Sequence, residues 1–368
     1  MPQNKQPKLV RISEKLQQNM QYVDELMGLE TNFDIIHRVI RLGDTDACMY
    51  LIDGFCKDEL MQKILQYLMD LKAEDFPKDA HEMSKIAIPY VEVDLDDTWE
   101  KILGALLSGV FVLLLDGYEK AVLIDARTYP TRGVEEPDKD KVLRGSKDGF
   151  VETVVFNTAL IRRRIRSTDL HMEMLNAGEN SRTDIVLCYM ESRVDPKLLT
   201  QIRERIRSIQ VDALAMNQES LAECLYQRKW YNPFPKFKYT ERPDTAAAQV
   251  LEGNLVILVD NSPSAMILPT TIFDVVEEAD DYYFPPVTGT YLRLTRFLIA
   301  LLTYFVTPTY LLLMNHRMWI PENLEFIILK EDPNVPLILQ FLLLELAIDG
   351  LRLAAVNTPN MLSTPLSV

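Results

Sequence analysis

Apolar residues follow two alternating patterns along the first part of the chain. In some segments they recur at spacings of three and four residues, which is typical of one face of an amphipathic helix. In others they form short continuous runs bounded by turn residues, which is typical of buried strands. The helical pattern is expected at 13–29, 58–71 and 97–108. Strands are expected at 47–52, 110–115 and 121–124. The alternation predicts sheets covered by helices, that is, an α/β region.

A similar order of elements returns in the second part of the chain. Strands are expected at 185–190, 255–259 and 265–268, and helices at 195–209 and 245–251. A shift of 144 residues superimposes Asp116 on Asp260, and a shift of 138 residues superimposes Asp46 on Asp184. This order predicts a tandem duplication, with two similar mixed-sheet subdomains that share one strand order. Two unrelated α/β units with similar element order remain the alternative.

The longest uncharged apolar run lies at 297–314, between Arg296 and Arg317. Its 18 residues, at a helical rise of about 1.5 Å each, approach the roughly 30 Å hydrocarbon core of a bilayer. The run therefore predicts a transmembrane helix, and a fully buried helix of a large soluble domain is the alternative. Pro308 lies near its middle and is expected to bend the helix, because proline removes one backbone donor.

A second apolar segment, 336–348, contains charged residues. Glu345 and Asp349 stand four residues apart on one helical face, and carboxylates at membrane depth usually face a protein interior or a water path. Both are candidate ion-facing groups of a pore. An interfacial or re-entrant helix whose acids reach solvent is an equal alternative. The proline-containing stretch 357–368 then ends the chain, which suggests a truncated membrane region.

Composition and motifs exclude several function classes. The chain carries 39 Lys+Arg against 54 Asp+Glu, a net charge of −15, which argues against nonspecific nucleic-acid binding. The first residues contain no apolar run resembling a signal peptide, so the N-terminal region is expected to stay cytosolic. The four cysteines and four histidines show no metal-type spacing, and phosphate-binding loops and nucleophile motifs are absent. We therefore expect no enzyme, no cofactor and no metal site.

Arginines mark the connection between the two α/β halves. Candidate interdomain contacts are Arg127, Arg132, Arg144, Arg162, Arg163 and Arg164. They could bind anions or lipid head groups, but pairing with carboxylates such as Glu135 and Glu136 is favoured, because the surrounding charge is negative. The expected domains are a first α/β subdomain (1–126), a loop (127–148), a second α/β subdomain (149–290) and the start of a helical membrane domain (291–368).

Several unusual segments together resemble one known family. RTYPTRGVEEPDKDKVLRGSKDGFVETVVFNTALIRRRIR at 127–166 resembles the signature of the GerA family, the A subunits of bacterial spore germinant receptors. The resemblance continues in KYTERPD (238–244), LVILVDNSP (255–263), DDYY (280–283) and NTPNMLSTPLSV (357–368). Within the family, the opening stretch 10–28 looks most like a paralogue of the receptor A subunits.

The resemblance implies a function in the spore. It implies a cytosolic α/β region followed by helices in the spore inner membrane, self-assembly as an oligomer such as a pentamer, and a role in an ion-conducting pore opened during germination. The implied partners are further copies of the chain, other spore membrane germination proteins and the lipid bilayer. Family members continue with further membrane helices, so conduction by this chain alone is doubtful. The alternative is a nutrient-binding subunit without its own pore, with a cleft between the two halves. A scaffold that recruits other germination proteins is a third hypothesis.

Overall fold

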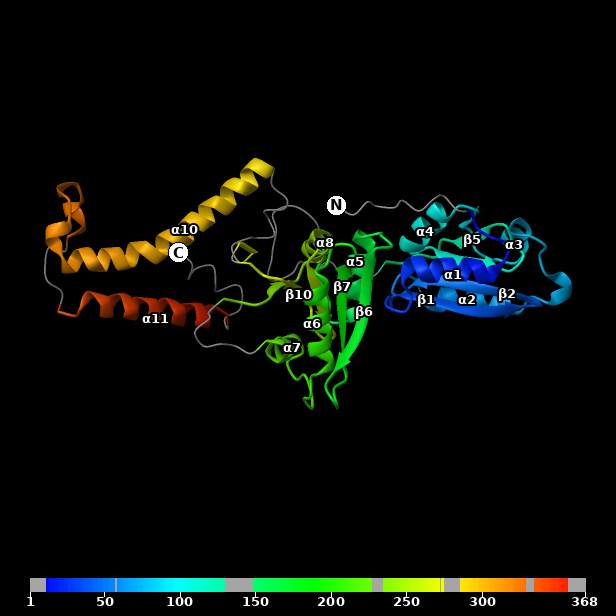
Figure 1. Ribbon diagram of the computed structural model, residues 1–368, viewed down its shortest axis with the longest axis horizontal. Coiled ribbons are helices and arrows are strands. Elements are labelled where there is room, and N and C mark those ends of the chain that lie inside the picture. The colour runs from blue at the N-terminus through cyan, green and yellow to red at the C-terminus, as the bar shows by residue number, and fades with distance from the viewer. Residues whose placement is uncertain are drawn as a thin grey trace. The chain divides into compact units, whose positions relative to one another are not determined.

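The computed structural model describes residues 11–56, 58–129, 148–226, 234–271, 273–274, 285–328 and 334–356 (Figure 1). The chain divides into two compact units, 1–284 and 285–368. The first unit contains both α/β halves, and the second contains the long apolar helices.

The first half is a five-stranded sheet with helices on both faces. Its strands are β1 (Ile35–Leu42), β2 (Thr45–Ile52), β3 (Val93–Asp96), β4 (Phe111–Leu115) and β5 (Ala121–Ile124), in the order β1-β2-β4-β5-β3. Its helices are α1 (Leu16–Met27), α2 (Asp58–Met69), α3 (Ala80–Ile86) and α4 (Trp99–Leu107), with a 3-10 turn at Ala73–Asp75. Apolar residues of α1 and α4 pack on one face of the sheet, and those of α2 and α3 pack on the other.

The second half repeats this arrangement. Its strands are β6 (Leu170–Ala177), β7 (Thr183–Met190), β8 (Lys238–Thr240), β9 (Leu255–Val259) and β10 (Ala265–Leu268), in the order β6-β7-β9-β10-β8. Its helices are α5 (Val154–Arg164), α6 (Pro196–Arg207), α7 (Gln218–Leu225) and α8 (Pro243–Glu252). Helices α5 and α8 cover one face, and α6 and α7 cover the other.

The strand registers confirm that the two halves are similar. Ala47 pairs with Leu115 where β2 meets β4, and Ile185 pairs with Val259 where β7 meets β9, so the shifts of 138 and 144 residues hold in space. The backbone N–H of Asp116 donates to the carbonyl of Asp46 over 2.9 Å. The corresponding bond from Asp260 to Asp184 has the same length.

One detail of the expectation is wrong: the sheets are antiparallel, not mixed, in all strand pairs of the described residues. The sequence pattern identified the apolar central strands but not the edge strands β1, β3, β6 and β8, nor the short helices α3 and α7. In β1, four consecutive residues from Ile36 to Val39 are exposed, so no apolar run or alternation marks the strand. Each unpredicted edge strand pairs antiparallel with a neighbouring strand and completes its sheet.

The second unit consists of helices. α10 (Pro286–Asn315) is followed by 3-10 turns at Arg317–Trp319 and Glu322–Ile327 and then by α11 (Leu337–Val356). α10 is, among the described residues, the single helix long and apolar enough to span a membrane, and its apolar window is not buried by the chain. The rings of Tyr310 and Phe341 lie 6.0 Å apart, which brings α10 and α11 into contact. α10 continues through Pro308 and changes direction along its length (Figure 1). Pro308 as the cause of that bend stays a prediction.

Candidate functional site

The two α/β halves meet around a buried ion pair. Arg162, near the end of α5, donates through Nε to Asp34 Oδ2 over 2.7 Å and through Nη2 to Asp34 Oδ1 over 2.9 Å. The side chains are 0% and 2% exposed, and Arg162 Nη1 also donates to the carbonyl of Leu170 over 3.1 Å. This bidentate geometry satisfies both charges where water is excluded. Arg162 therefore connects the helix of one half to the chain entering β1 of the other.

The same segment of the first half covers part of the edge of the second sheet. The Asn32 side chain accepts from Met172 N over 2.7 Å, and Phe33 N donates to the Met172 carbonyl over 3.3 Å. Asn32 is itself held by its bond to the carbonyl of Met27, over 2.6 Å. The end of α1 and the residues after it thus position an extended segment against β6.

His171 completes this joint. Its Nδ1 lies 2.9 Å from the hydroxyl of Thr31, and its ring stacks on Tyr189 with centroids 5.7 Å apart. Gly28 has a φ of +56°, and a Cβ there would lie 2.8 Å from His171 Cε1, so only glycine fits without a shift. Partial burial lowers the pKa of His171 below its ordinary value, and the nearby Arg162 acts in the same direction. The neutral imidazole is therefore favoured at the joint.

The other described arginines of the predicted set also contact protein groups. Arg127 pairs with Asp125, and this pairing holds the pKa of the Asp125 carboxyl below its usual range. Arg164 pairs with Asp148 over 2.5 Å. The Arg163 guanidinium lies 4.3 Å from the centre of the Tyr129 ring, which is a cation–π distance.

Arg132 and Arg144 lie outside the described residues, as do Glu135 and Glu136. Sequence reasoning named Arg162 but not its partner, and it missed Asn32 and His171. No short motif marks those two residues, because their roles depend on contacts with residues 140 positions away.

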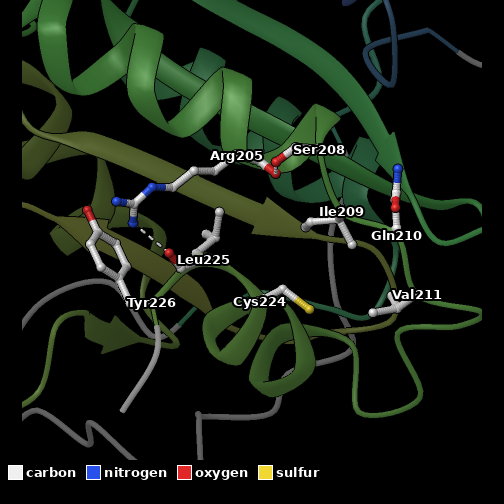
Figure 2. Close-up of a pocket in the computed structure, with 8 residues that line it drawn as sticks. All are labelled: Arg205, Ser208, Ile209, Gln210, Val211, Cys224, Leu225 and Tyr226. Atoms are coloured by element: carbon white, nitrogen blue, oxygen red, sulfur yellow. Dashed lines mark hydrogen bonds between the residues drawn. The ribbon is translucent and has the colours of Figure 1, made fainter. Parts of the chain in front are cut away.

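A separate cavity of about 570 Å³ opens on the second half between the ends of α6 and α7 (Figure 2). It is lined by Arg205, Ser208, Ile209, Gln210, Val211, Cys224, Leu225 and Tyr226. Arg205 lies over the Tyr226 ring at 4.5 Å and donates to the Leu225 carbonyl over 2.6 Å (Figure 2). Burial, and then the charge of Glu223, raise the pKa of the Cys224 thiol, which disfavours a nucleophilic thiolate. The cavity thus offers a stacked guanidinium and polar groups rather than a reactive centre.

The candidate pore residues lie on α11. Glu345 and Asp349 are exposed on this helix, one turn apart. Within the described part of the chain, no group of three or more His, Cys, Asp or Glu residues could hold a metal ion.

Comparison with known proteins gives one consistent family. Residues 21–368 match the family model described as Bacillus/Clostridium GerA spore germination protein. Stage V sporulation protein AF of Bacillus subtilis (strain 168) is 38% identical over 370 residues, covering 100% of this chain and 74% of that protein. Spore germination protein A1 of the same organism is 30% identical, covering 92% of this chain and 70% of that protein.

A solved structure matches the first unit. The crystal structure of the N-terminal domain of the A subunit of the Bacillus megaterium spore germinant receptor GerK3 has a TM-score of 0.55 and 27% identity. The match covers 72% of this chain and 98% of that domain.

Proposed function

Because this chain belongs to the GerA family of spore germination proteins, as its motifs predict, we propose that it is a membrane subunit of a spore germination complex. In this proposal it assembles with copies of itself, and with other spore membrane germination proteins, and contributes to an ion-conducting channel opened during germination. It acts by binding and conduction rather than by catalysis.

The observation that carries the proposal is the uncovered apolar surface of α10. The helix has 30 residues, about 45 Å at the usual rise, and its apolar window is not buried by the rest of the chain. Exposed side chains such as Leu298, Leu302 and Phe305 need lipid or other helices around them. Self-assembly in a bilayer supplies both.

The charges that flank the apolar stretch of α10 support an orientation in the spore inner membrane. Arg293 and Arg296 precede the apolar stretch, whereas Arg317 alone closely follows it. Basic residues favour the cytoplasmic side, so the large N-terminal region would face the spore core. From there the N-terminal region could transmit a conformational change to α10 through the first residues of that helix.

In this proposal, α11 supplies the ion-facing groups. Glu345 and Asp349 would line a path shared by five or another small number of copies, and their carboxylates would favour cations by direct attraction and by replacing lost hydration. The test is potassium flux from liposomes containing the full-length protein and its Glu345→Gln/Asp349→Asn variant. We expect flux and the preference for cations over anions to fall at least several-fold.

A matched control tests the charge loss alone. Glu322→Gln/Glu325→Gln removes two carboxylates from the 3-10 turn between the helices and should leave flux unchanged. Unchanged flux and selectivity in the α11 variant would reject Glu345 and Asp349 as pore residues. Absence of flux from the wild-type protein together with its partners would reject the channel itself.

A second candidate function is germinant sensing by the α/β region without a pore in this chain. It is supported by the likeness to the N-terminal domain of a germinant receptor A subunit and by the open cavity beside Arg205. Calorimetry of the purified chain with amino acids and sugars distinguishes the two functions. Saturable binding that Arg205→Ala abolishes would favour sensing, and no heat of binding would count against it.

A further inference from the structure

The two edges of the first sheet carry opposite charges. Edge strand β1 exposes Arg38 and Arg41. Edge strand β3, at the other side of the same sheet, exposes Asp94 and is preceded by the exposed Glu92. A basic strand edge is unusual in a chain of net charge −15, and an acidic edge of the same sheet is complementary to it.

Both edges have backbone groups that point away from the sheet. Asp34 accepts a bond from Asp53 N over 2.8 Å, and in an antiparallel pair such bonded positions alternate. Residues 37, 39 and 41 therefore direct their N–H and C=O groups outward. In the described part of the chain, no backbone hydrogen bond from another segment reaches these three residues.

The same reasoning applies to β3. Glu92 accepts from Asp125 N over 2.9 Å, so Val93 and Leu95 direct their backbone groups outward. The N–H of Leu95 bonds to the adjacent Asp94 carboxylate over 2.8 Å instead of to a strand. The next outward-facing carbonyl, that of Asp97, accepts a hydrogen bond from Ile12 N over 2.9 Å.

The duplicated half shows how such an edge is closed. At β6, the counterpart of β1, Asn32 and Phe33 bond to Met172. The seam between β6 and α6 is closed by Glu173, which pairs with Arg203 at 2.7 Å and Arg207 at 3.6 Å. Among the described residues of the first half, neither closure is present.

At the positions equivalent to this salt-bridged seam, the first half is apolar. A shift of 138 residues puts Leu65 and Met69 of α2 where α6 has Arg203 and Arg207. Together with Met61 they border a shallow groove of about 550 Å³. Beside the opposite edge, Ile86 is 67% exposed and Val91 is 96% exposed. Apolar surface therefore accompanies the complementary charge at both edges.

We propose that the β1 edge of one copy pairs with the β3 edge of a second copy, so that the first sheet continues from subunit to subunit. This inference rests on the proposed self-assembly and names the surface that produces it. Arg41 of one copy then lies on the same sheet face as Glu92 and Asp94 of the next, whereas Arg38 lies on the face of the α2 groove, which receives the apolar side chains beside β3. Pairing of β1 with a second β1 would instead set arginines against arginines.

The pairing is parallel and head to tail. Four successive antiparallel pairings separate β1 from β3, so the two strands run in the same direction. Rotation of a subunit about an axis along the strands preserves that direction, and such heterologous contacts form a ring when the rotation closes. A ring around a common axis is also the arrangement that a shared pore needs.

Cross-linking of two variants, each with one added cysteine, tests the contact directly. Val39→Cys and Asp94→Cys proteins, whose new thiols lie on the same sheet face, are distinguished by tags of different size, mixed in detergent, reassembled in nanodiscs and oxidised. The expected product is the mixed dimer, at least several-fold above the background from native cysteines. Val39→Cys mixed with Glu179→Cys, a substitution in an exposed turn of the second half, is the control. Equal yields in the two mixtures would overturn the proposal.

Charge reversal provides a second measurement, by sedimentation of the full chain in detergent. Arg38→Glu/Arg41→Glu should weaken self-association at least tenfold, and Glu92→Lys/Asp94→Lys in the same chain should restore it. Lys197→Glu/Lys236→Glu makes the same change in net charge at exposed sites of the second half, away from both edges, and should have no effect. Weakening without rescue would mean that another acidic segment occupies β1, which contradicts the proposal.

The outcomes separate this surface from the proposed function. Wild-type oligomers and flux that persist unchanged in the charge-reversed protein would reject the edge pairing and leave the channel standing. Absence of flux from the wild-type protein together with its partners, with the expected cross-linking, would reject the channel and leave the edge pairing standing. A wild-type chain that stays monomeric in membranes would reject both the pairing and the self-assembly.

Discussion

Arg162 and Asp34 form a bidentate ion pair, 2.7 Å and 2.9 Å long, that joins the two α/β halves out of contact with water. Each half has its own sheet and its own cores, so the relative placement of the halves depends on a small number of such contacts. Removing one partner leaves the other as a buried charge without compensation.

Arg162→Met should therefore destabilise the first unit by about 3–5 kcal/mol. The double variant Asp34→Leu/Arg162→Met removes both charges and should recover much of that loss. Thermal unfolding followed by circular dichroism measures both effects. Lys101→Ala, which removes an exposed partner of Asp96, is the control and should leave the midpoint unchanged. Equal destabilisation by the single and double variants would show that the burial of charge is not the cause.

Equivalent aspartates hold the first helix of each half. Asp116 Oδ1 accepts from Leu16 N over 2.9 Å at the start of α1, and Asp260 Oδ1 accepts from Val154 N over 3.1 Å at the start of α5. Asp116→Ala and Asp260→Ala should each cost about 1 kcal/mol, the usual value for a lost N-terminal cap. Unfolding curves of the two variants should shift by similar amounts, and the Asn variants, which keep an acceptor, should shift less. A large difference between the two sites would argue against equivalent roles in the repeat.

Stability should fall as pH decreases from 7.5 to 5.5. Burial lowers the pKa of His171 in the folded state below the ordinary value of 6.5, so the unfolded chain binds more protons in this range. The stability that the neutral imidazole contributes is fully present above the ordinary pKa of 6.5, and it is lost as the pH falls below 6.5 through the lowered pKa of the folded state. His171→Gln should flatten the dependence of the unfolding midpoint on pH, whereas His81→Gln, at an exposed position on α3, should preserve it. If His171→Gln leaves the pH dependence of the unfolding midpoint unchanged, other titratable groups cause that dependence.

A charge in the middle of α10 should prevent its insertion. Leu302→Arg places a guanidinium near the centre of the apolar stretch, where it costs about 2.5–3.5 kcal/mol on insertion scales. The fraction of protein that resists carbonate extraction from membranes should drop, and Leu302→Ala should not change it. Full retention of the arginine variant would indicate that α10 does not span the bilayer.

The family, the apolar helix α10 and the positions of the central strands followed from the sequence alone. Long uncharged runs, short buried runs and turn residues are local signals that need no knowledge of the fold. Equivalences such as Asp116 with Asp260 also appeared in the sequence, because a duplicated chain keeps its turn residues in order.

The tertiary structure alone decided the edge strands, the antiparallel sheets and the joint between the halves. β1 shows no regular alternation of buried and exposed residues, because it lies at a sheet edge. There, water, helices and the neighbouring strand contact different sides of the strand. Arg162 was visible in the sequence as one of a run of arginines, but its partner is 128 residues away. Only folding brings such residues together, and the resulting exclusion of water determines which of several similar arginines holds the halves in place.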